Sequence, residues 1–278
     1  MASNRSNGIM RLLSAAALAI GIVFALLPMP SVHASVQQLS STSQKQFDRI
    51  KASSAQANAA KLQTLYNDFQ SLQNQNAVRD ARVKAAAKQN DANEAALRKQ
   101  ISLIDKTKID RLAVKAQQTK DRYQPLFHRQ AAAAAELKAV KKLGSKPLTA
   151  AMQLQKDLIE IAVKAAKADI AGAEAELKAA KSVASAAMKR LRGQLDAIAK
   201  EEQRISTERT AISQLNKQKT AEWSDLLYAL RGGDSGSVNR SLTTLGNLLR
   251  DTAVRQSRME EGEARIAAVI RSVASQLR

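Results

Sequence analysis

The fold is decided by residues 163–226, which read VKAAKADIAGAEAELKAAKSVASAAMKRLRGQLDAIAKEEQRISTERTAISQLNKQKTAEWSDL. An apolar residue returns there at every seventh position: Val163, Ile170, Leu177, Ala184, Leu191, Ile198, Ile205, Ile212 and, after an interruption at Lys219, Leu226. A strict seven-residue apolar repeat keeps one stripe of a long helix facing its neighbours over many turns. The stretch therefore predicts a long helix in a coiled coil.

The composition agrees with a rod rather than a globular core. Of 278 residues, 45% are hydrophobic but only 3% are aromatic, so small side chains make up much of the apolar content. Such a composition, together with a sustained heptad period, is typical of long helices. Ten glycines and four prolines leave few places for the chain to turn.

The N-terminus reads as a secretory signal peptide over residues 1–34. Arg5 and Arg11 precede the uncharged apolar run 12–27, and small residues at 32 and 34 suit cleavage before Ser35. An uncleaved membrane anchor is the alternative, although the run is shorter than a usual span. The chain has no cysteine, so disulfides, thiolate metal sites and lipoprotein anchoring are excluded. We expect a secreted or cell-envelope location.

Two turns divide the remaining chain into helices. Residues 36 to about 122 contain no glycine or proline and predict one continuous helix, weak and frayed over 35–60. Pro125 predicts a kink or break near Tyr123. A turn near residues 144–147 should send the next helix back antiparallel, completing a hairpin over 35–231. After the glycine-rich turn 232–236, residues 237–278 should fold back on 191–230. The predicted fold is all-α: a long antiparallel coiled-coil hairpin, thickened to three helices near one end by a C-terminal helix.

Positive charge gathers around the predicted hairpin turn. Residues 35–278 carry 42 lysines and arginines against 25 acidic residues, and residues 79–146 alone hold 17 against 7. Lys138, Lys141, Lys142 and Lys146 lie at the turn itself, so we expect them to contact an anionic cell-wall polymer or membrane surface. The alternative is a solvated helical face. Few aromatic residues accompany these charges, so sequence-specific nucleic-acid binding is not expected.

Catalytic, cofactor and metal sites are not expected. Cleavage would leave His128 as the last histidine, which excludes a metal site with several histidine ligands. The loop 232–236 lacks the Gly-Lys-Ser/Thr ending of a phosphate loop. Trp223 is either an anchor for a partner protein or part of the core under the last helix.

These observations predict a non-enzymatic envelope protein that acts as a spacer, scaffold or regulator with a basic tip. The alternative is an adaptor that recruits another envelope protein, such as a cell-wall hydrolase or a transporter component. At the level of fold alone, the layout resembles the coiled-coil halves of secreted cell-wall hydrolase regulators. The polar seam residues Asn76 and Asn90 also allow pairing with a second chain, so a homodimer is a further expectation.

Overall fold

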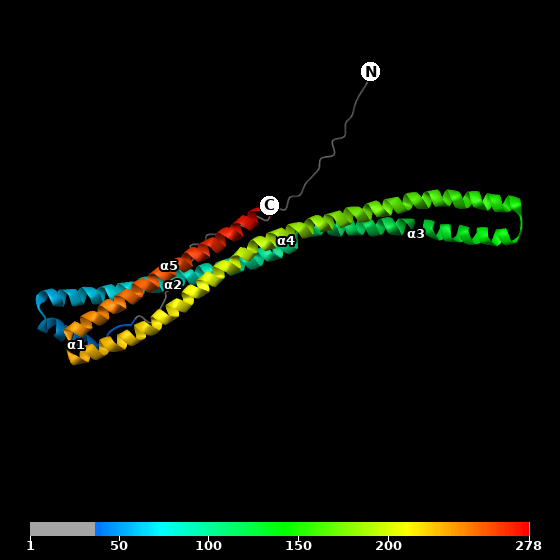
Figure 1. Ribbon diagram of the computed structural model, residues 1–278. Helices are drawn as coiled ribbons and strands as arrows, with labels where there is room; N and C mark the ends of the chain where they lie inside the picture. The colour runs from blue at the N-terminus through cyan, green and yellow to red at the C-terminus, as the bar shows by residue number, and fades with distance from the viewer. Residues whose placement is uncertain (1–36, 278) are drawn as a thin grey trace, which may run out of the picture.

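The computed structural model describes residues 37–277 and is built from helices (Figure 1). They are α1 (Ser41–Ser53), α2 (Gln56–Ser102), α3 (Lys106–Lys142), α4 (Lys146–Gly232) and α5 (Ser235–Ser275). No residue of the described range lies in a strand, which confirms the all-α prediction. The proposed signal peptide, residues 1–34, falls outside the described residues.

The long helix α4 is the element along which the others are arranged. Its 87 residues rise about 130 Å at ~1.5 Å per residue. Figure 1 shows α2 and then α3 following it from one end to the other, in a gently curved rod. Every member of the seven-residue column in α4, Lys219 included, is buried or half-buried. The heptad pattern therefore identified the inward face correctly.

Helix α5 packs on both α2 and α4 and makes one half of the rod thicker. Its bonds to α2 pair Asn76 with Leu249 and Asn90 with Glu263, so the two helices run parallel. Its ion pairs with α4 join Arg255 to Glu208 and Arg265 to Glu201, so those two helices run antiparallel. All three helices contribute to one apolar core between residues 83 and 273.

A second core closes the end of the rod where α4 turns into α5. It joins the start of α2, the end of α4 and the start of α5, and α1 folds back onto it. Phe47 of α1 is only 1% exposed, and its ring centroid lies 5.4 Å from that of Tyr66. The predicted fraying of residues 35–60 is therefore wrong: Phe47 and Ile50 give α1 an apolar face, and Ser40 caps its first turn.

The first arm is also not one continuous helix. It breaks at residues 54–55, where the Ser53 and Ser54 hydroxyls donate to the Ile50 carbonyl, and again at 103–105, where Asp105 is left-handed with φ 54°. The second break lies where α5 ends, so the core changes there from three helices to two.

Of the kink or break predicted near Tyr123, the break does not occur: α3 continues through Pro125. Contacts with α4 hold the helix just before it: the Tyr123 hydroxyl donates to Asp169 at 2.5 Å, and Arg122 pairs with the same carboxylate at 3.5 Å. Across residues 37–277, none of the helices combines the length and the hydropathy that a membrane span requires.

Candidate functional site

The rod ends in the short connection between α3 and α4, residues 143–145. The Leu143 amide donates to the Val140 carbonyl, and Gly144 takes the left-handed conformation with φ 68°, which favours glycine. Pro147 follows in the first turn of α4, where its missing N–H has no cost. Local sequence thus makes a tight reversal at the far end of the rod, which we call the tip (residues 138–148).

The four lysines predicted at the tip are all exposed. Lys138, Lys141 and Lys142 end α3, and Lys146 begins α4. The ion pairs of this arm lie further along it, at Lys115 with Glu176, Lys120 with Glu174 and Lys156 with Glu160. Within the described residues, no carboxylate lies within 4 Å of the four tip ammonium groups. Their charge is therefore uncompensated by direct contacts.

Helix dipoles distinguish these lysines from one another. Lys141 and Lys142 lie in the last turn of α3, where the dipole favours positive charge. Lys146 lies in the first turn of α4, where the dipole disfavours it. That turn has no acidic residue, and the Ser145 side chain makes no capping bond. Lys146 therefore works against the local stability of α4.

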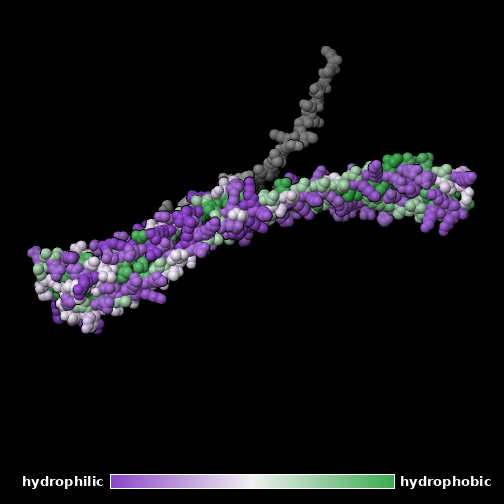
Figure 2. Space-filling model, in the orientation of Figure 1, coloured by the Kyte–Doolittle hydropathy of each residue, from purple (hydrophilic) through white to green (hydrophobic). Residues whose placement is uncertain are grey.

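Large aliphatic side chains are exposed at the tip and beside it. Leu143 is 75% exposed and Leu148 45%, and Leu154, Leu158 and Ile161 follow along α4. Figure 2 shows a hydrophobic patch on the α4 side of this end of the rod. These residues lie outside the heptad column that begins at Val163, so that repeat did not predict them. The signal was present, since Leu154, Leu158 and Ile161 share a second helical face.

The tip also has an open hollow of about 490 Å³ on its surface. It is lined by Lys141, Gly144, Lys146, Thr149, Ala150 and Gln153. Pockets for small molecules enclose most of the ligand. This hollow is open and edged by lysines, so it suits contact with an extended anionic surface better.

Trp223 lies far from the tip, in the core at the other end of α4. Its ring stacks on Phe69 of α2 with centroids 5.4 Å apart and planes at 15°. It is half-buried and packs against the cluster that contains Leu226 and Leu230. Core packing accounts for this residue, against α2 as well as the last helix. Its role as a partner anchor stays a prediction.

Buried polar groups lie between α2 and α5. Asn76 donates to the Leu249 carbonyl at 2.8 Å, and Gln256 donates back to the Asn76 carbonyl at 3.0 Å. Asn90 donates to both the carbonyl and the carboxylate of Glu263, at 2.9 Å each. Asparagines at seam positions thus set the register of α2 against α5 in the same chain.

Two ionisable groups are held in the interior of the thick half. Glu263 is 4% exposed, and burial raises the pKa of its carboxyl group, while the Asn90 bond opposes this shift. Lys219 interrupts the heptad column, and burial lowers the pKa of its ammonium group. Glu263 adjoins a cavity of about 240 Å³ together with Asp91, Glu94, Glu202 and Arg209.

Across residues 37–277, no three histidine, cysteine or acidic side chains are grouped so that they could hold a metal ion. His128 is exposed on α3.

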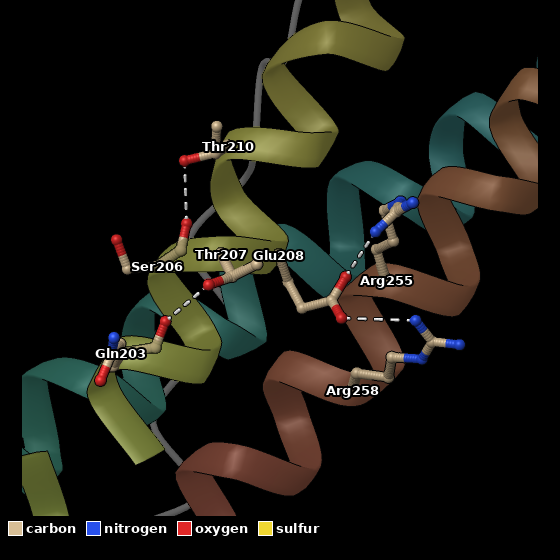
Figure 3. Close-up of polar contacts among 7 residues, drawn as sticks. All are labelled: Gln203, Ser206, Thr207, Glu208, Thr210, Arg255 and Arg258. Carbon is tan, nitrogen blue, oxygen red and sulfur yellow. Dashed lines mark hydrogen bonds and ion pairs between the residues drawn. The ribbon is translucent and has the colours of Figure 1, made fainter. Parts of the chain in front are cut away.

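Charged contacts between α4 and α5 have a structural role. Figure 3 shows Glu208 of α4 reaching two arginines of α5, Arg255 at 2.9 Å and Arg258 at 3.3 Å. Arg265 makes a similar bond to Glu201 at 2.8 Å. These arginines hold α5 in place and are not free for a partner.

Comparison of the chain with protein-family models, curated proteins and solved structures gave no match. The proposals below therefore rest on the chain's own residues.

Proposed function

We propose that this chain is a non-enzymatic, exported coiled-coil rod of the cell envelope, a spacer or scaffold whose basic tip contacts an anionic surface. The export step rests on residues 1–34, which have the pattern of a signal peptide. The contact rests on the tip lysines.

The coiled-coil part of this proposal concerns α3 and α4. Their ion pairs join Lys115 to Glu176 at 2.8 Å and Lys120 to Glu174 at 2.5 Å, so partner numbers fall on one helix as they rise on the other. This order is that of an antiparallel pair. The buried residues between the two helices are mainly alanines and repeat in the seam of α4 at Ala166, Ala173 and Ala180. Small seam residues allow a close approach of two helices.

One observation carries the functional proposal: four exposed lysines meet at the end of a rod about 130 Å long, and none has an ion-pair partner among residues 37–277. Each lysine near an anionic surface contributes about 1 kcal/mol. Four together would give a weak but measurable attraction, which salt should reduce because the Debye length is only about 8 Å at ~0.15 M. Lys146 supports the proposal further. Its position lowers the stability of α4, so helix stability does not explain a lysine there, whereas contact with an anionic surface does.

The test is co-sedimentation of residues 35–278 with vesicles of anionic phospholipid, over a range of salt concentrations. We expect binding that falls steeply as salt rises. Reversal of Lys138, Lys141, Lys142 and Lys146 to glutamate should abolish it, and helicity by circular dichroism should stay the same because glutamate is a good helix former.

A matched control reverses Lys61, Lys88, Lys200 and Lys217, which are also exposed and outside the ion pairs of the described chain. Arg255 and Arg258 are unsuitable controls because they hold α5 to Glu208. The control changes net charge by the same amount as the tip variant. Equal losses from both variants would show that diffuse net charge is responsible, and full binding by the tip variant would refute the proposal.

A further inference from the structure

The outward face of α4 near the tip carries an apolar stripe that no other part of residues 37–277 covers. Leu154, Leu158 and Ile161 are 64%, 61% and 69% exposed. Steps of four and three residues place them on one side of the helix. Val163 and Ala166, which pack toward α3, are buried on the other side. The stripe is therefore not part of the seam that holds the hairpin together.

Small residues extend this face on either side of the three large ones. Pro147, Ala151 and Ala165 are exposed and continue the same steps of four and three. From 147 to 165 the face is about 27 Å long at ~1.5 Å per residue. A straight stripe with this spacing fits another helix laid along α4.

The charges beside the stripe indicate which helix fits. Asp157 and Lys164 are exposed and lie seven residues apart, on the same flank of the stripe. Neither makes an ion pair within the described residues, and Asp157 accepts only a bond from Gln153 at 2.8 Å. A second α4 laid antiparallel would place each Asp157 opposite the partner's Lys164, twice by symmetry. In a parallel copy this flank would face the opposite flank of the partner helix, so Asp157 and Lys164 would not meet.

We infer that two copies of this chain pair antiparallel through the outward faces of their α4 helices near the tip. Leu158 of one copy then lies opposite Ile161 of the other, and Leu154 opposite Ala165. The two rods overlap at their tips and extend in opposite directions. This inference does not depend on contact with an anionic surface.

The pairing leaves the lysines of α3 accessible. Leu137 is buried toward α4, whereas Lys138, Lys141 and Lys142 are exposed. Like charges of the two tips therefore do not meet in the contact. The stripe is short, so the interface belongs to the small class, below about 1,200 Å², in which complexes are transient.

Sedimentation velocity over a range of protein concentrations tests the pairing. Wild type should change from monomer to dimer in the micromolar range, and Leu158→Glu should raise Kd by about 100-fold or more, because both copies lose a buried leucine. The exposed position leaves the monomer's helicity unchanged. Lys217→Glu, which removes an exposed lysine far from the stripe, is the control.

Charge reversal tests the orientation of the pair. Asp157→Lys and Lys164→Asp should each weaken the dimer about tenfold, and the double variant should restore it, because the opposite charges face each other again. A double variant that stays weak would overturn the antiparallel register.

Cysteine crosslinking gives an independent reading of the same register, since the chain has no native cysteine. In Leu154→Cys/Ala165→Cys, the two positions are about 16 Å apart within one helix and cannot bridge each other. Peptide mapping should find a 154–165 disulfide between chains. Disulfides of 154 with 154 would mean a parallel pair and overturn the inference. A wild type that stays monomeric, with vesicle binding lost in Leu158→Glu, would assign the stripe to lipid instead.

Discussion

Glu263 of α5 has a buried carboxyl group that lies against α2 and accepts a hydrogen bond from Asn90. Burial is the main cause of its raised pKa, with smaller contributions from Asp91 and Glu202 that raise it and from Asn90 and Arg209 that lower it. The folded chain therefore keeps a proton on Glu263 at pH values where the unfolded chain has lost it. Above the ordinary glutamate pKa of about 4.3, this group lowers the stability of the fold as pH rises.

Replacing Glu263 with glutamine should remove this penalty. Glutamine keeps an acceptor for the Asn90 amide, so the variant should gain about 1–2 kcal/mol at pH 7 and little at pH ~4, where the carboxyl group is protonated. Urea unfolding at both pH values measures the difference. Lowered pKa values are found for the carboxyl groups of Asp48, Asp234 and Glu201, so their stabilising contribution to the fold is lost in acid. This loss is the same in wild type and variant. A gain of the same size at both pH values would contradict this account.

At the scale of elements, the approach of α4 to α5 depends on Gly262. A Cβ atom there would lie 2.8 Å from the Ile205 Cγ1 atom, so the two helices or the Ile205 side chain would have to shift. Gly172 of α4, by contrast, has open space around it, so no helix packs closely against this residue.

Alanine substitutions at these two glycines should have opposite effects. Gly172→Ala should raise the free energy of unfolding by up to about 1 kcal/mol, the gain in helix propensity. Gly262→Ala has the same gain but adds a clash that costs about 1–3 kcal/mol, so it should destabilise the chain. Thermal unfolding of both variants measures the contrast. If both variants were stabilised, α5 could shift away from Ile205 of α4 without a loss of stability.

The apolar repeat of the sequence predicted the helices that carry it, above all α4. The column of α4 is buried or half-buried as expected, because a seven-residue repeat reports the inward face directly. Val238, Leu242, Leu245 and Val273 of α5 are buried as well. The breaks at 54–55 and 103–105 carry no glycine or proline. They depend on tertiary contacts, those of Phe47 with Tyr66 and the end of α5, which no local pattern contains.

The candidate site was predicted in part. Local composition pointed to the tip lysines, because charge density is visible in a sequence. Leu154, Leu158 and Ile161 were missed, since their exposure is known only once the other face of α4 is seen to pack on α3.

The whole molecule has halves of unequal thickness. Around residues 191–205 of α4, large side chains of α2 and α5 surround the helix, including Leu97, Ile101, Ile266 and Ile270. Nearer the tip, α3 is the one described helix that covers it, and the buried residues of α3 are just Ala116, Ala133 and Leu137. An alanine buries far less apolar area than a leucine, so each turn of the thin half is stabilised less.

Hydrogen exchange of the native chain should therefore separate the two halves. We expect amides of α3 and of residues 146–183 to exchange through local opening, with protection well below that of α5 and of residues 191–230, which should approach the free energy of global unfolding. The measurement is made at low protein concentration, so that pairing of α4 helices does not add protection near the tip. Arg265→Ala removes the ion pair with Glu201, so it should lower protection locally in the thick half and leave α3 unchanged. Uniform protection along α4 would show instead that the rod opens as one cooperative unit, with the alanine seam as firmly closed as the three-helix core.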